Sequence, residues 1–120
     1  MWNRVRPIVA VVLIVLTLSV AGCSQPGSVD ASNATIIDVR TPAEYAQGHL
    51  QGAVDIDVQA ADFSSKIAGL PHDGTYLLYC RSGSRASQAK TIMDQAGFTS
   101  VTNLGSLQAA SSTTGLPIVT

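Results

Sequence analysis

The stretch TYLLYCRSGSRA, residues 75–86, decides the fold class and contains the most reactive side chain of the chain. Its first five residues are apolar and β-prone, which predicts a buried strand over Thr75–Tyr79. Cys80 follows directly, and a short basic loop then leads into a helical pattern over Ala86–Ala96. In α/β folds, active sites lie beyond the carboxyl ends of such strands. Cys80 is therefore the first candidate for a functional residue.

The loop after Cys80 predicts an anion site around a reactive sulfur. Backbone N–H groups in a tight loop and at a helix N-terminus gather positive potential. That potential favours the thiolate, which is the reactive form of cysteine. Gly83 allows the loop to curl inward. We predict that Cys80 is the nucleophile and that the substrate is bound by Arg81, Ser82, Gly83, Ser84 and Arg85.

These residues also allow plainer interpretations. A free cysteine is often an inert buried side chain, Arg81 can be simply solvated, and Arg85 can be a charge on a helix surface. However, a positive charge at a helix N-terminus is unfavourable without an anion nearby. The pattern therefore favours a loop built to hold an anion.

The composition indicates one packed domain. The chain has 120 residues, of which 46% are hydrophobic and 12% charged, so a core is expected and wholesale disorder is not. The net charge is −1, and no cluster of basic and aromatic residues is present. Nucleic acid is therefore excluded as the expected partner.

Outward from residues 75–86, strand-like and helix-like segments alternate. Thr41 and Glu44 match a capping box around Pro42, which begins a helix that ends near Gly48. This alternation predicts an α/β fold with a mostly parallel sheet and helices on its faces. The expected strands are 35–39, 53–56, 75–79 and 100–104, and the further helices are 60–68, 86–96 and 107–112.

The N-terminus has the pattern of an export signal. Arg4 and Arg6 precede an apolar run over residues 8–22, which is shorter than the roughly 20 residues of a spanning helix. The run ends in Val20-Ala21-Gly22-Cys23, which resembles the lipobox of bacterial lipoproteins. The resemblance implies a signal peptide over 1–22 and a lipid on Cys23. The alternative is an uncleaved membrane anchor.

This interpretation predicts where the domain lies and which thiols it keeps. We expect a protein anchored by lipid at Cys23 on the extracytoplasmic face of the cell membrane, with a flexible tether through residue 33 and one domain over 34–119. A lipidated Cys23 leaves Cys80 as the only free thiol.

Other polar residues are expected to support the site. Asp38 and Arg40 end a buried strand, so each requires a partner. His49 is assigned a structural hydrogen-bonding role, with a general base as the alternative, and Glu44 is explained by capping. The histidines and Cys80 lack metal-ligand spacing, so the sequence predicts no metal and no cofactor.

Four motifs in order resemble the rhodanese family. They are Ile37-Asp38-Val39-Arg40 with Glu44-Tyr45, Gly48–Ala53, Tyr79–Ala86 and Gly115-Leu116-Pro117-Ile118. The resemblance covers residues 34–119 and implies a three-layer fold with helices on both faces of the sheet. It also implies a sulfurtransferase. The family's loop cysteine takes sulfane sulfur from a small anionic donor such as thiosulfate, holds it as a persulfide, and passes it to cyanide or a thiol.

The chain departs from the family in the segment 103–110. That segment has one glycine and no tryptophan, where the family commonly has Gly-Gly and then Trp. This predicts weaker support of the loop from the last helix. A low-turnover module that binds sulfane sulfur or senses redox state is therefore an alternative to the enzyme.

A second enzyme class is disfavoured by loop length. Phosphatases and arsenate reductases of related architecture use a loop one residue longer between Cys and Arg. Here four residues separate Cys80 from Arg85, and this tighter loop disfavours phosphate, so a phosphatase or arsenate reductase is the less favoured alternative.

Overall fold

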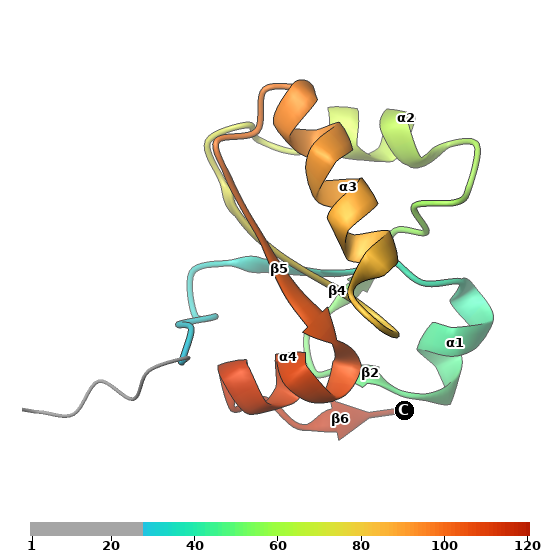
Figure 1. Ribbon diagram of the computed structural model, residues 1–120, viewed down its shortest axis with the longest axis vertical. Helices are drawn as coiled ribbons and strands as arrows, with labels where there is room; N and C mark the ends of the chain where they lie inside the picture. The colour runs from blue at the N-terminus through green and yellow to red at the C-terminus, as the bar shows by residue number, and fades with distance from the viewer. Residues whose placement is uncertain (1–27) are drawn as a thin grey trace, which may run out of the picture.

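The computed structural model describes residues 28–120, and the predicted signal peptide and lipidation site at Cys23 lie outside them. Helices and strands alternate along the chain (Figure 1). The elements are β1 (Thr35–Asp38), α1 (Pro42–Gln47), β2 (His49–Leu50), β3 (Val54–Asp55), α2 (Phe63–Ala68), β4 (Thr75–Cys80), α3 (Ser84–Gln95), β5 (Ser100–Ser106), α4 (Leu107–Thr114) and β6 (Ile118–Val119).

The main sheet has four strands in the order β3-β1-β4-β5, and each pair of adjacent strands is parallel. β4 lies inside the sheet and is buried from Tyr76 to Cys80, which explains its continuous apolar run. Because the strands are parallel, their carboxyl ends share one edge, and Cys80 lies on that edge. β2 and β6 form a separate antiparallel pair.

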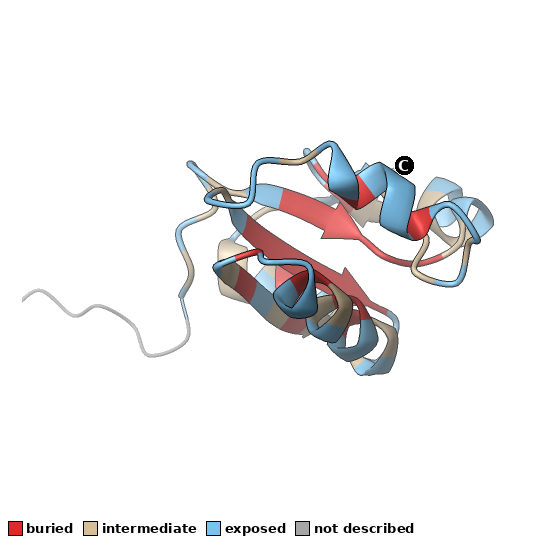
Figure 2. Cartoon of the chain, turned by 90° about the horizontal axis from the view of Figure 1, so that it is seen from above, coloured by how far each residue is buried: buried red, intermediate tan, exposed pale blue. Residues whose placement is uncertain are grey.

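Two apolar clusters occupy the two faces of the sheet. One contains Leu78 and Val101 and packs under α2 and α3, while the other contains Leu77 and Leu104 and packs under α4. Adjacent residues of β4 enter opposite clusters because strand side chains alternate between faces. Figure 2 shows the buried strands between exposed helical surfaces. The predicted α/β fold with helices on both faces is confirmed.

Local chemistry sets the helix ends. In α1, Thr41 Oγ1 accepts the Glu44 N–H and Glu44 accepts the Thr41 N–H, so the predicted capping box is formed. Helix α3 ends before Gly97, whose φ of +97° suits a glycine, and the Phe98 N–H donates to the carbonyl of Met93.

The structure differs from the expected elements mainly at their ends. Helix α3 begins at Ser84 instead of Ala86, and α2 begins at Phe63 instead of Ala60. The strands β2 and β6 were not predicted, because two residues each carry no periodic signal.

The segment just before β1 is also more ordered than a tether. Val29 donates its N–H to the Thr113 carbonyl at 2.9 Å, and Val29 and Ala31 pack against the apolar cluster under α4. Val29 and Ala31, in the predicted tether, therefore pack on the domain that the sequence predicts from residue 34. Within residues 28–120, no helix is long and apolar enough to cross a membrane.

Candidate active site

Cys80 is the last residue of β4 and is fully buried, with 0% relative exposure. The Gly83 N–H donates to Cys80 Sγ at 2.9 Å. Burial raises the pKa of the Cys80 thiol. Backbone N–H groups in the loop and at the start of α3 lower this pKa by more than burial raises it, so the pKa lies below its ordinary value. These groups belong to Ala86, Ser82, Gly83 and Arg85. The loop thus stabilises a negative sulfur through its backbone.

Gly83 is needed for this geometry. Its φ is +97°, and a Cβ at this position would lie 3.2 Å from Gly105 Cα. The Asn103 amide connects the two segments, because Nδ2 donates to the Gly83 carbonyl at 3.0 Å and Oδ1 accepts the Gly105 N–H at 2.8 Å. The loop is therefore braced from β5. The family pattern predicts this support from the last helix, whereas in the structure Asn103 on β5 makes these contacts with the loop.

Arg85 forms a bidentate ion pair with Glu44. Its two terminal nitrogens lie 2.8 and 2.9 Å from the two carboxylate oxygens of Glu44. The pair lowers the pKa of Glu44 to about 2 and raises that of Arg85. This corrects two interpretations. The anion beside Arg85 is a carboxylate of the chain itself, and Glu44 does more than cap α1. The two residues are 41 positions apart, so no local pattern indicates their contact.

Asp38 and Arg40 also pair with each other. Arg40 Nε and Nη2 donate to the buried carboxylate of Asp38 at 2.9 and 2.7 Å, and Nη2 also donates to the Gly48 carbonyl at 2.7 Å. Arg40 thereby joins the end of β1 to the end of α1. Its hydrogen bonds to Asp38 raise the pKa of Arg40.

His49 lies on β2, away from the sulfur loop in sequence. Its Nδ1 is 2.9 Å from the Tyr45 carbonyl oxygen, and its ring stacks on that of Tyr45 with a centroid separation of 3.7 Å. These contacts hold the ring against α1.

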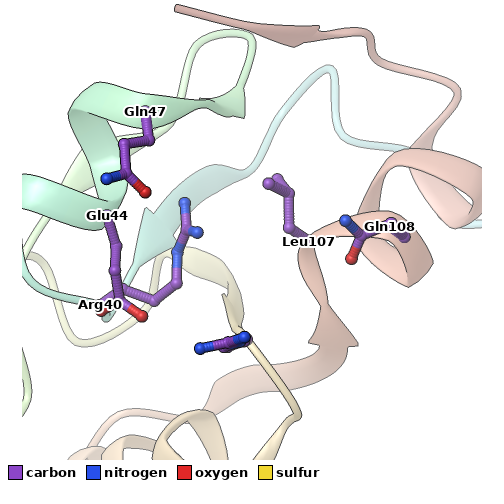
Figure 3. Close-up of a pocket in the computed structure, with 6 residues that line it drawn as sticks. Arg40, Glu44, Gln47, Leu107 and Gln108 are labelled. Atoms are coloured by element: carbon purple, nitrogen blue, oxygen red, sulfur yellow. The ribbon is translucent and has the colours of Figure 1, made fainter.

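A pocket of about 290 Å³ opens beside the loop (Figure 3). Helix α1 supplies its wall on one side and α4 on the other, with Arg40 between them. Its lining residues are Arg40, Glu44, Gln47, Arg81, Leu107 and Gln108. The sequence pattern does not indicate Gln47, Leu107 or Gln108, because two helices far apart in the chain, α1 and α4, bring them together and none belongs to a motif with recognisable chemistry.

The loop residues therefore divide into two groups. Ser82, Gly83 and Arg85 act on the sulfur through their backbone N–H groups, whereas the Arg81 side chain faces the pocket. Ser84 begins α3, and its N–H lies 3.5 Å from Ser82 Oγ. In residues 28–120, no cluster of His, Cys, Asp and Glu could hold a metal ion.

A buried sulfur held by backbone donors at the end of a parallel strand suits covalent sulfur chemistry, and comparison with known proteins gives the family. The model for the rhodanese-like domain matches residues 27–112. The chain belongs to the rhodanese family. The predicted rhodanese resemblance is thus confirmed, and the match includes the first three of the four sequence motifs.

Two curated relatives of this rhodanese domain are sulfurtransferases from bacteria. A sulfurtransferase of Allochromatium vinosum is 36% identical over 90 residues, which cover 75% of this chain and 82% of the relative. The thiosulfate sulfurtransferase PspE of Escherichia coli is 38% identical over 72 residues, which cover 60% of this chain and 69% of the relative.

Solved structures show the same fold. A rhodanese with anions from E. coli has a TM-score of 0.61 and 34% identity, and the match covers 72% of this chain and 96% of that one. The rhodanese-like domain of the Alr3790 protein from Anabaena has a TM-score of 0.64 and 28% identity, with 72% and 99% covered.

Proposed function

We propose that this rhodanese domain transfers sulfane sulfur from thiosulfate or a persulfide donor to a thiol or cyanide, through a persulfide on Cys80. The observation that carries the proposal is the set of backbone N–H groups around Cys80 Sγ, led by the 2.9 Å bond from Gly83. A persulfide is an anion, so the same donors stabilise it after the first step.

In the first half-reaction, the Cys80 thiolate attacks the outer sulfur of thiosulfate. A new S–S bond forms, the S–S bond of thiosulfate breaks, and its electron pair leaves with sulfite. Thiosulfate is a dianion, and Arg81 supplies positive charge at the mouth of the loop. No outside oxidant or reductant is needed.

In the second half-reaction, an acceptor attacks the terminal sulfur of the persulfide. The bond between that sulfur and Cys80 Sγ breaks, and the electron pair returns to Sγ as thiolate. Because Sγ then lies again among the loop N–H groups, it is a good leaving group and is ready for another cycle.

Steady-state kinetics test this proposal. The full chain in detergent is given thiosulfate and cyanide, and thiocyanate is measured while both concentrations are varied. Parallel double-reciprocal lines are expected, as for a ping-pong reaction, and Cys80→Ser is expected to abolish turnover. Turnover that survives in Cys80→Ser would contradict the proposal. A persulfide that forms but is never discharged would favour the low-turnover binding module instead.

We further propose that the domain is anchored by lipid at Cys23 on the extracytoplasmic face of the membrane. The support is the lipobox-like Val20–Cys23 after a short apolar run. Bacteria that express the chain are grown with a labelled palmitate analogue. Label is expected on the wild type and not on Cys23→Ser. A wild type that stays in the membrane without label would instead indicate an uncleaved anchor.

A further inference from the structure

We propose that the domain lies on the membrane with one particular face against the lipid headgroups. This α4–β6 face consists of α4, β6 and the turn between them, residues 107–120. The partner is the bilayer that holds the anchor at Cys23. The inference therefore rests on the proposed lipid anchoring, and it does not depend on the sulfur chemistry.

The chain enters the domain at this face. The Val29 N–H donates to the Thr113 carbonyl near the end of α4 at 2.9 Å, and Val29 packs against the apolar cluster under α4. Only residues 24–28 separate Cys23 from this contact. At most about 3.6 Å per residue, they reach about 20 Å, which is less than the diameter of roughly 30 Å expected for a domain of this size. The short connection keeps the α4–β6 face near the bilayer, also if residues 8–22 remain as an uncleaved anchor.

The charges of the domain are concentrated away from this face. Residues 97–120 contain no Asp, Glu, Lys, Arg or His. Figure 1 shows α2 and the C-terminal half of α3 at the opposite end of the domain, where ion pairs join Asp62 to Lys66 and Lys90 to Asp94. The entering segment carries one carboxylate, Asp30, which accepts the Ser32 N–H.

This distribution of charge favours one orientation. The domain has more acidic than basic side chains, and anionic lipids repel an acidic surface. A charged side chain pressed against the headgroups would also lose hydration. The uncharged α4–β6 face is therefore the end of the domain that approaches a bilayer most readily.

The side chains of the face suit the headgroup layer. Ile118 on β6 is 43% exposed, and Pro117 before it is exposed as well. Around them, the outer side of α4 presents Gln108 and Ser112. An amide and a hydroxyl can donate hydrogen bonds to the phosphate and carbonyl oxygens of lipids without bringing a charge to the interface.

This orientation brings the pocket close to the bilayer. Leu107 and Gln108 begin α4 and line the pocket, whereas Thr113 near the end of the same helix holds the entering chain. The eight residues of α4 span about 12 Å. The pocket therefore lies within about one helix length of the point where the chain arrives from the membrane.

Tryptophan fluorescence of the full chain in vesicles of phosphatidylcholine and phosphatidylglycerol tests the inference. Trp2, the only tryptophan, is replaced by Trp2→Phe, and single probes are then added. Ile118→Trp and Ser112→Trp probe the face, and Gln88→Trp, at an exposed position on α3, is the matched control. A nitroxide on the phosphatidylcholine headgroup quenches tryptophans in that layer. Both face probes should lose at least about half of their emission, as expected for side chains at the interface, and the α3 probe should keep nearly all of it.

A charge added to the face tests the electrostatic argument. In the Ile118→Trp chain, Ser112→Glu should weaken the quenching at least about twofold, because anionic lipid repels the new carboxylate. Gln95→Glu adds the same charge at an exposed position in the last turn of α3 and should leave the quenching unchanged. Equal quenching in the two variants would overturn the inference.

Sedimentation of the vesicles separates this inference from the anchoring. Pelleted protein that is quenched equally at the face and α3 probes would overturn the inference and leave the anchoring standing. Face probes whose emission shifts to the blue without quenching would show that protein covers the face, which would also overturn the inference alone. Protein that stays in the supernatant would overturn the anchoring, and the inference with it.

Discussion

At the scale of single residues, the charge state of Cys80 depends on backbone donors more than on basic side chains. From the sequence, Arg85 was expected to bind the substrate anion. In the structure its guanidinium is paired with the Glu44 carboxylate. The N–H groups at the sulfur are held in place by the conformation of Gly83. The reactive state of the thiol should therefore respond to loop geometry.

We predict that Gly83→Ala raises the pKa of Cys80 toward that of an ordinary thiol. A side chain at φ +97° costs about 1–2 kcal/mol, and its Cβ would press on Gly105 Cα at 3.2 Å and shift the loop. The measurement is the rate of alkylation by iodoacetamide against pH. Gly52→Ala is the matched control, because Gly52 has φ +82° but open space around it. Gly52→Ala should lower stability and leave the thiol unchanged. An unchanged alkylation profile in Gly83→Ala would contradict the role given to the loop.

The carboxyl group of Asp55, at the end of β3, makes the stability of the domain depend on pH. Burial, together with the charges of Asp38 and Asp57, raises the pKa of Asp55 to about 6, and one of its oxygens is buried without a partner. A raised carboxyl pKa means that the folded state is favoured at low pH. The stability that the protonated Asp55 carboxyl contributes is lost as the pH rises from about 4 through 6.

Asp55→Asn should therefore stabilise the domain at pH 7.5 and have little effect near pH 4. After discounting for partial exposure, the expected gain is about 1 kcal/mol, or about 4–8 °C in Tm. Thermal unfolding at both pH values measures it. Asp62→Asn, at an exposed position, is the control and should change little at either pH. The same shift at both pH values would show that the ionisation of Asp55 is not the cause.

At the scale of elements, the ion pair between Glu44 and Arg85 connects α1 to the start of α3, on either side of the sulfur loop. The pKa of Glu44 is lowered to about 2 from an ordinary 4.5. The pair therefore stabilises the fold above pH 4.5, and this contribution is lost as pH falls from 4.5 to 2.

Glu44→Gln should lower the free energy of unfolding by about 1–2 kcal/mol at neutral pH, since both partners are partly exposed. Glutamine can still complete the capping box with Thr41, so the substitution isolates the ion pair. Denaturant unfolding between pH 2 and 7 measures it. The difference from the wild type should vanish near pH 2. A difference that persists there would mean that the lost interaction is not the ion pair.

The brace from β5 to the loop is tested by Asn103→Ala. The variant loses the bonds to the Gly83 carbonyl and to the Gly105 N–H. Stability should fall by about 1–2 kcal/mol, and alkylation of Cys80 at pH 7 should slow because the loop donors are no longer fixed. Thr102→Ala, at the exposed neighbouring position on β5, is the control. Equal alkylation rates in the two variants would mean that β5 does not position the loop.

Elements with a periodic or capping signal could be predicted from the sequence. The capping box at Thr41, the buried run of β4 and the glycine after α3 each follow from neighbours within a few residues. Strands β2 and β6 are too short for a pattern, and they exist because tertiary pairing joins His49 to Val119. The same limit applies to the start of α3, which lies two residues earlier than the apolar pattern indicates.

At the scale of the whole molecule, the position of the reactive sulfur could be predicted from the sequence. The residues that line the pocket beside it could not. Parallel strands place Cys80 at the carboxyl edge of the sheet, so the position of the sulfur follows from topology. The pocket is built by α1, the loop and α4 together. Gln47 and Gln108 are 61 positions apart, and only the folded chain brings them to one cavity.

The central claim is that the loop holds Cys80 as a thiolate able to carry one sulfane sulfur. Intact mass spectrometry of the full chain before and after thiosulfate, beside Cys80→Ser, tests it most directly. The account predicts a gain of about 32 Da, one sulfur atom, in the wild type and none in the variant, with the added mass removed by a reducing thiol. A wild type that gains no sulfur, or a gain that persists in Cys80→Ser, would contradict it.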